Sequence, residues 1–153
     1  MIFVTVGSIH FDPLVQFIDH QVGCGVIASP VVIQIANGKY EPKYCYSFRS
    51  APGLDEWYGR ADLVIGHGGT GTTLEVLERG LRQISVCNPE MIDNHQDEFL
   101  DALSVRGLVR YCRAFEEIPR MINEALKLPA PEPIQTASFF KSIIMDIERF
   151  DAN

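Results

Sequence analysis

The residues between Asp62 and Glu75 most constrain the fold of this chain, because they read as a strand, a glycine-rich turn and the start of a helix. Residues 63–65 form a short apolar run of the kind that a fully buried parallel strand shows. Four glycines follow between positions 66 and 71, and from Leu74 onward the apolar residues recur at helical spacing. The segment therefore predicts one β–α unit of a parallel sheet.

The same turn has the properties of an anion site. A helix that begins just after glycine offers free backbone N–H groups and the positive end of its dipole, and glycine lets a ligand approach that backbone closely. Such a site suits a phosphate or diphosphate. Hydroxyls at Thr70, Thr72 and Thr73 surround the turn, and Glu75 lies where its carboxylate could accept hydrogen bonds from ribose hydroxyls. The candidate binding residues here are His67, Gly68, Gly69, Thr70, Gly71, Thr72 and Glu75.

Two alternatives stay open for this turn. It can be a tight connection that binds nothing, and Gly66-x-Gly68-x-x-Gly71 also satisfies the dinucleotide fingerprint. That fingerprint normally follows the first strand of its unit. Because several elements precede this turn, its position argues against an NAD-type site.

The rest of the chain alternates strands with helices, which predicts an α/β fold: a single Rossmann-like domain with a mostly parallel six-stranded sheet and helices on both faces. Asp12 is expected to cap the first helix, with Pro13 in its first turn. The domain is expected to span residues 1–128, followed at 129–153 by a proline-rich link and an amphipathic helix. The expected strands are 2–6, 31–36, 44–48, 63–65, 83–87 and 108–112, and the expected helices are 13–22, 54–58, 74–79, 94–106, 115–128 and 134–150.

Other polar residues follow strand ends, where open α/β sheets bind ligands. Gly7 and Ser8 come after the first strand, and His10 lies on the same side as either a solvated loop residue or a general base. His95 and Gln96 open a later helix, which Asp93 or Asn94 can cap. They are interpreted either as part of that helix start or as polar groups that face the glycine turn.

Composition excludes some functions. A net charge of −7 and a pI near 5.0 exclude the broad basic surface of a nucleic-acid-binding protein. The four cysteines are widely spaced with no C-x-x-C pair, which favours a reduced, cytoplasmic compartment. No basic leader is visible, and no apolar run approaches the ~20 residues of a membrane span, so membrane attachment would need another anchor.

The segments 67–75 and 93–96, together with Gly80, resemble the donor-binding half of UDP-sugar glycosyltransferases of family 28, which have the GT-B fold. The opening residues 4–8 and 11–14 are similar to those of one-domain subunits of this family. Such subunits occur in the two-part N-acetylglucosaminyltransferase that extends dolichol-linked sugar and in bacterial exopolysaccharide and capsule synthesis. The resemblance covers roughly the first 115 residues.

The resemblance implies a role for each matching residue. Gly7 and Ser8 would lie near the diphosphate, with Ser8 where the family often has threonine, and His67 and Thr72 would contact it. The backbone of Phe48-Arg49 would read the uracil edge. Glu75 would bind the ribose, and His95 and Gln96 would hold hydroxyls of the donor sugar. No metal and no cofactor is implied, because the UDP-sugar is a substrate.

The implied reaction is displacement of UDP from the anomeric carbon by an acceptor hydroxyl, with inversion. Two-domain relatives use an amino-terminal half to bind the acceptor and supply the base, and this chain does not contain that half. The expectation is therefore a cytoplasmic enzyme subunit, inactive alone, that a membrane-anchored partner recruits to a lipid-linked saccharide acceptor. The base would be His10 or a residue of the partner. The alternatives are a non-catalytic accessory subunit of a glycosyltransferase and a nucleotide-binding module of the NAD type.

Overall fold

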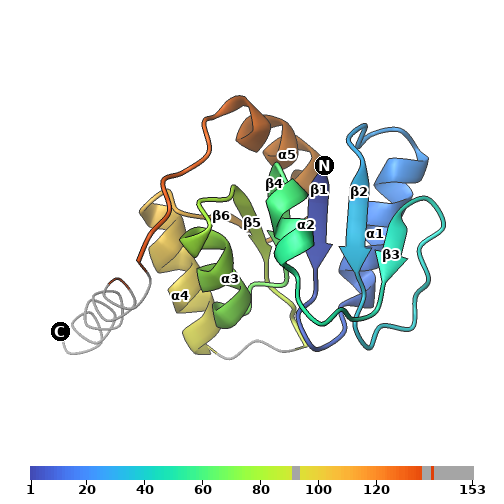
Figure 1. Cartoon of the computed structure of the whole chain (residues 1–153), viewed down its shortest axis with the longest axis horizontal. Coiled ribbons are helices and arrows are strands. Elements are labelled where there is room, and N and C mark those ends of the chain that lie inside the picture. The colour runs from blue at the N-terminus through green and yellow to red at the C-terminus, as the bar shows by residue number, and fades with distance from the viewer. Residues whose placement is uncertain (91–93, 136–138, 140–153) are drawn as a thin grey trace.

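A computed structural model describes residues 1–90, 94–135 and 139 of the 153-residue chain. Its centre is a six-stranded sheet in the order β3-β2-β1-β4-β5-β6, in which every neighbouring pair is parallel (Figure 1). The expected α/β fold is confirmed, and the sheet is wholly rather than mostly parallel. The strands are β1 (Ile2–Thr5), β2 (Val31–Gln34), β3 (Tyr46–Phe48), β4 (Leu63–Gly66), β5 (Gln83–Val86) and β6 (Arg110–Cys112).

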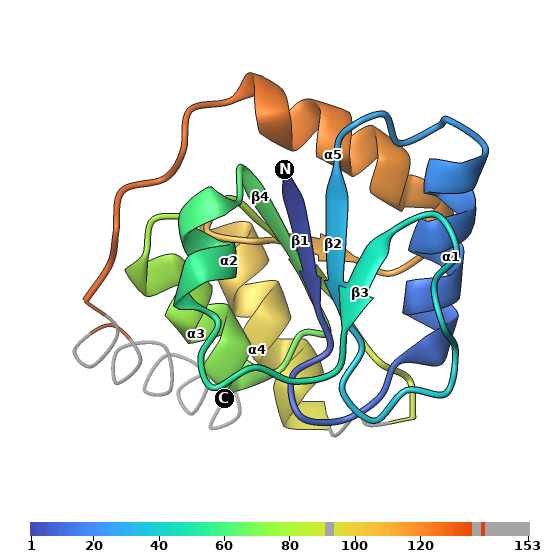
Figure 2. The same ribbon diagram turned by 45° about the vertical axis from the view of Figure 1, so that its right-hand side comes forward.

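Helices cover both faces of this sheet. Figure 2 shows α1 and α5 on one side and α2, α3 and α4 on the other. The described helices are α1 (Asp12–Gly23), α2 (Asp55–Arg60), α3 (Thr70–Glu78), α4 (Asn94–Val105) and α5 (Ile118–Lys127), which follows a 3-10 turn at Phe115–Glu117. The turn shortens the expected helix 115–128, and Pro119 lies in the first turn of α5.

The four central strands, β1, β2, β4 and β5, are mostly apolar because both of their faces are buried. In β1, Ile2 and Val4 pack into the cluster that includes α1 and α5. Phe3 points the other way and packs with Tyr58 of α2 and Val76 of α3. A second cluster on that face joins α3 and α4 around Leu77, Leu100 and Leu103. Alternation along a strand thus divides the apolar side chains between the two faces of the sheet.

The chain reverses its direction across the sheet between β1 and β4. From β1 it proceeds outward through β2 and β3, and from β4 it proceeds the opposite way through β5 and β6. Thr5 pairs with Gly66 at the carboxyl ends of these two central strands. The loops that follow them therefore leave the sheet side by side, at the position where open α/β sheets bind ligands.

The expected cap of the first helix is wrong. Phe11 occupies the N-cap position of α1, and no side chain caps the helix. Asp12 is the first helical residue, and its carboxylate accepts hydrogen bonds from the backbone N–H of Lys39 at 2.9 and 3.1 Å. A contact between segments 27 residues apart thus replaces the local capping bond.

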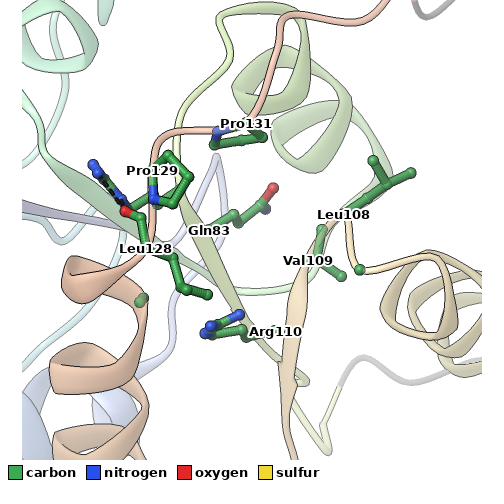
Figure 3. Close-up of a pocket in the computed structure, with 10 residues that line it drawn as sticks. Gln83, Leu108, Val109, Arg110, Leu128, Pro129 and Pro131 are labelled. Atoms are coloured by element: carbon green, nitrogen blue, oxygen red, sulfur yellow. Dashed lines mark hydrogen bonds between the residues drawn. The ribbon is translucent and has the colours of Figure 1, made fainter.

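The proline-rich segment after α5 lies against the domain. Arg82 donates two hydrogen bonds to the carbonyl of Leu128, at 2.7 and 2.9 Å, and the N–H of Ile134 donates to the carbonyl of Leu77. Pro129 and Pro131 border a cavity of about 90 Å³ at the first residues of β5 and β6 (Figure 3). We call residues 128–135 the strap. Most of the helix expected at 134–150 lies outside the described residues.

Candidate functional site

The loops after β1 and β4 meet at His67, the first residue beyond β4. Its backbone N–H donates to the carbonyl of Thr5 at 3.2 Å, which extends the pairing of the two strands by one step. Its imidazole lies between Gly7 and Gly69. A Cβ atom at Gly7 would lie 2.6 Å from His67 Cε1, and one at Gly69 would collide with Nε2. The two glycines therefore provide the space that the imidazole occupies.

Burial lowers the pKa of the His67 imidazole below its ordinary value, although the Thr5 carbonyl opposes this shift. The ring is therefore neutral near pH 7 and carries one N–H. Its Nδ1 atom is buried and has no hydrogen-bond partner in the described part of the chain.

The glycine turn opens α3 without a side-chain cap. Gly69 is the N-cap residue in an extended conformation, and the first helical bond runs from the N–H of Thr73 to its carbonyl. A Cβ atom added at Gly71 would meet nothing within 4 Å, so the approach to this end of the helix is open. Uncapped N–H groups at an open helix start can bind an anion.

The structure brings Gln96 of α4 beside this turn. Gly68 has a positive φ of 78°, and a Cβ atom there would lie 2.9 Å from Leu100 and 3.6 Å from Nε2 of Gln96. Gln96 and Gly68 are therefore neighbours, as expected from the interpretation in which Gln96 faces the glycine turn. His95 is the second residue of α4, and its side chain, like Asp93, lies outside the part of the chain that is described.

The three threonines near the turn have different surroundings. Thr70 begins α3, and the methyl group of Thr72 lies 3.6 Å from a Cβ position at Gly66. Thr73 is fully buried, and its Oγ1 accepts a hydrogen bond from Gln83 at 3.3 Å. The expectation of a hydroxyl cluster around a ligand is thus wrong for Thr73, which faces β5.

Glu75 faces α2 and is 42% exposed. Its carboxylate accepts a hydrogen bond from the Tyr58 hydroxyl at 3.3 Å and pairs with Arg79 at 3.3 Å. Arg79 also pairs with Asp55 at 2.6 Å, and its guanidinium lies 4.8 Å from the centre of the Tyr58 ring. The neighbours hold Glu75 in place and leave part of its carboxylate accessible.

A cavity of about 490 Å³ lies at the carboxyl ends of β1, β2 and β3. It contains three of the predicted site residues, Gly7, Ser8 and Arg49. The Arg49 guanidinium donates to the carbonyls of Gly38 at 2.8 Å and Ala36 at 3.3 Å, and it pairs with Glu41. The remaining lining residues are Gln34, Ala36, Asn37 and Ser50.

Sequence reasoning missed the buried polar network under this cavity. Thr5 Oγ1 donates to Gln34 Oε1 at 2.5 Å, and Gln34 Nε2 donates to the Gly7 carbonyl at 2.8 Å. The N–H of Gly7 donates back to Thr5 Oγ1 at 3.2 Å. A sequence signal existed, because Thr5 and Gln34 are polar residues at the ends of apolar strands.

His10 lies at the edge of the site. It is 53% exposed, and its Nε2 lies 3.4 Å from a carboxylate oxygen of Glu90.

Beyond β5 and β6, a further cavity of about 450 Å³ has Asp97, Tyr111 and Arg113 in its wall. Arg113 pairs there with Asp97 at 3.2 Å.

Within residues 1–90, 94–135 and 139, no three His, Cys, Asp or Glu side chains are grouped so that they could hold a metal ion. None of the helices described in that part has the length and apolar character needed to span a membrane.

Comparison with known proteins places this arrangement in a family. The model of the glycosyltransferase family 28 C-terminal domain matches residues 1–147. The UDP-N-acetylglucosamine transferase subunit ALG13 of Homo sapiens is 35% identical over 122 residues, which are 72% of this chain and 11% of that protein. The protein of the same name from Saccharomyces cerevisiae is 32% identical over 97 residues, 63% of this chain and 46% of the relative. The chain therefore spans only part of these relatives.

Solved structures share the fold. The solution structure of ALG13 superposes with a TM-score of 0.68 at 19% identity, covering 93% of this chain and 94% of that one. The crystal structure of Acinetobacter baumannii MurG gives a TM-score of 0.63 at 18% identity, covering 80% of this chain and 40% of that one. At these identities the likeness concerns the fold alone.

Proposed function

Because the chain belongs to the glycosyltransferase family 28 C-terminal domain family, we propose that it is the donor-binding subunit of an inverting UDP-sugar glycosyltransferase. The observation that carries this proposal is the position of His67 between Gly7 and Gly69, at the point where the chain reverses across the sheet. The names of the relatives, which are called UDP-N-acetylglucosamine transferase subunits, favour UDP-N-acetylglucosamine as the donor.

The diphosphate would bind at the glycine turn. The neutral imidazole of His67 would donate its one hydrogen bond to a phosphate oxygen, and the uncapped N–H groups at the start of α3 would supply others. The lack of any obstruction at Gly71 leaves room for phosphate oxygens at the helix start.

The remaining parts of the donor would lie to either side. The carboxylate of Glu75, held by Tyr58 and Arg79, would accept hydrogen bonds from the ribose. The backbone of Arg49 would read the uracil edge next to the cavity that this residue lines. Gln96 beside Gly68, together with His95, would bind the sugar hydroxyls.

This arrangement would favour departure of UDP. Negative charge grows on the diphosphate as the bond to the anomeric carbon breaks, so fixed N–H donors and the α3 dipole stabilise the transition state more than the bound donor. The acceptor hydroxyl must lose a proton as it attacks. His10 is exposed beside the site and is one candidate base, and a residue of the partner is the other.

The partner follows from the same proposal. The relatives are named subunits, and the family model that this chain matches is that of a C-terminal domain. We therefore expect a second protein that binds a lipid-linked saccharide acceptor and is anchored in a membrane, at whose cytoplasmic face this chain would act.

Calorimetric titration of the chain with UDP tests the donor site, with NADH as the competing ligand class. Binding of UDP that His67→Ala weakens about tenfold or more supports the proposal. Absence of UDP binding at millimolar concentration, or preferential binding of NADH, contradicts it. A transfer assay with UDP-N-acetylglucosamine and the co-purified partner then separates a catalytic subunit from an accessory one, because only the former loses turnover with His67→Ala.

A further inference from the structure

The loop that follows β1 has a hydrogen-bond donor on each of four successive carbonyls. Gln34 Nε2 donates to the Gly7 carbonyl at 2.8 Å, and Asn37 Nδ2 donates to that of Ser8 at 3.1 Å. The backbone N–H of Asn37 donates to the Ile9 carbonyl at 3.1 Å. Asn88 Nδ2 donates to the His10 carbonyl at 3.1 Å. These donors come from the last residue of β2, from the turn that follows β2 and from the loop after β5, not from the β1 loop itself.

The N–H groups of the same loop are occupied differently. That of Gly7 donates to Thr5 Oγ1 at 3.2 Å. Those of Ser8, Ile9 and His10 have no hydrogen-bond partner in the described ranges 1–90, 94–135 and 139. Gly7 and Ser8 also line the 490 Å³ cavity. The loop thus has engaged carbonyls and unengaged N–H groups.

We propose that Gln34, Asn37 and Asn88 are positioning residues, which fix this loop in the conformation that binds the donor's diphosphate. This inference rests on the proposed function. A free peptide group can rotate and present its carbonyl oxygen to a phosphate, which repels it. Hydrogen bonds to the carbonyls prevent that rotation and keep successive N–H groups available, which is how backbone concavities bind anions. A loop fixed before binding also loses less entropy when the ligand arrives.

Asn88 does more than hold one carbonyl. It is 2% exposed, and its Oδ1 accepts a hydrogen bond from the N–H of Glu90 at 3.1 Å. One buried amide thus links the loop after β1 with the loop after β5, which leads to Gln96. Its side-chain amide provides both the donor for the His10 carbonyl and the acceptor for the N–H of Glu90.

The test compares three neutral replacements that remove a donor and add no charge: Asn37→Ala, Gln34→Met and Asn88→Leu. Asn123→Ala, on the exposed side of α5, is the matched control for Asn37→Ala, because Asn37 is exposed as well. Calorimetry measures the affinity of each folded full-length variant for UDP. NMR titration measures it for uridine, which has no phosphate. We expect UDP affinity to fall about threefold for Asn37→Ala and about tenfold for each buried replacement, with uridine affinity and the control unchanged.

A second measurement keeps the proposal testable if Gln34→Met or Asn88→Leu fails to fold. In the wild-type chain, the amide NMR signals of Ser8, Ile9 and His10 should move when UDP is added and remain in place with uridine. Wild-type protein that binds UDP without moving these signals overturns the positioning role. So does an equal loss of UDP and uridine affinity, which indicates a structural role alone. Wild-type protein that binds no UDP overturns the proposed function instead.

Discussion

The imidazole of His67 occupies the space that a side chain at Gly7 would need, since a Cβ atom there would lie 2.6 Å from His67 Cε1. The loops after the two central strands are therefore fitted to each other, and a change in one must disturb the other.

Gly7→Ala should lower the free energy of unfolding more than Gly25→Ala does. Both glycines have positive φ, 69° and 73°, so an alanine costs about 1 kcal/mol at either position. Only Gly7 has the imidazole as a neighbour, whereas a Cβ at Gly25 meets nothing within 4 Å. The collision should add about 1–3 kcal/mol in urea titrations. Equal destabilisation of the two variants would show that the loops are not fitted together.

Gly71→Ala should raise stability and weaken UDP binding. Space is open around Gly71, and alanine is favoured over glycine in a helix by about 1 kcal/mol. The new methyl group would occupy the approach to the start of α3. Gly59→Ala in α2, where space is also open, should stabilise without affecting binding. Thermal unfolding and calorimetry check both effects, and unchanged UDP affinity in Gly71→Ala would argue against a diphosphate at this helix start.

Glu75→Gln should remove the preference for a ribose 2′-hydroxyl. A hydrogen bond to a carboxylate contributes about 1.5–3 kcal/mol, so wild-type protein should bind UDP at least about tenfold more tightly than 2′-deoxy-UDP. The variant should bind the two nucleotides within about threefold of each other. Glu124→Gln breaks an ion pair of the same helical spacing on α5 and serves as the control. A preference that persists in Glu75→Gln would exclude this carboxylate from ribose recognition.

The stability of the wild-type chain should decrease as the pH falls below about 6.5, the unfolded pKa of histidine. The pKa of His67 is lowered in the folded state, so between the two pKa values the unfolded chain binds more protons and acid favours unfolding. Urea titrations at pH 7.5 and 5.5 should show a smaller decrease for His67→Gln than for wild type. His20→Gln, at an exposed position of α1, should keep the wild-type decrease.

Asp19→Asn should destabilise the domain by about 2–4 kcal/mol. The Asp19 carboxylate is fully buried and accepts hydrogen bonds from the Tyr40 hydroxyl at 2.8 Å and from three successive backbone N–H groups, those of residues 43–45. Burial alone would raise its pKa, but these bonds outweigh burial and lower it. Its contribution is thus present above about pH 3.9 and lost as the pH falls through the folded value. Tyr40→Phe, which removes one of the bonds, should cost about 1 kcal/mol in the same urea titrations.

The strands were predictable because burial of both faces leaves a direct trace in the sequence. A short, wholly apolar run such as residues 63–65 is typical of a central parallel strand, and few other structures fit it. The glycine turn was equally clear, since the positive φ of Gly68 is a property of glycine. The strand ends were less clear, and β2 stops at Gln34 although apolar residues continue to position 36.

The polar contacts were not predictable, because their partners are distant in sequence. Asn88 and the His10 carbonyl are 78 residues apart, and Asp12 meets Lys39 instead of capping its own helix. The contact of the Thr73 side chain was not predictable either, although its partner is only ten residues away. Its hydroxyl matched a ligand-binding pattern, yet its place on α3 directs it to Gln83.

The strap determines on which side of the domain a segment attached after it would lie. The hydrogen bonds of Leu128 and Ile134, and the packing of Ile134 and Phe139 against the α3–α4 cluster, carry the polypeptide past the amino ends of β5 and β6. This is the end of the sheet opposite the loops that follow β1 and β4. A reporter or affinity handle joined after Phe139 would thus start on the flank formed by α3 and α4. A shortened version cut at Lys127 would strip apolar cover from that flank.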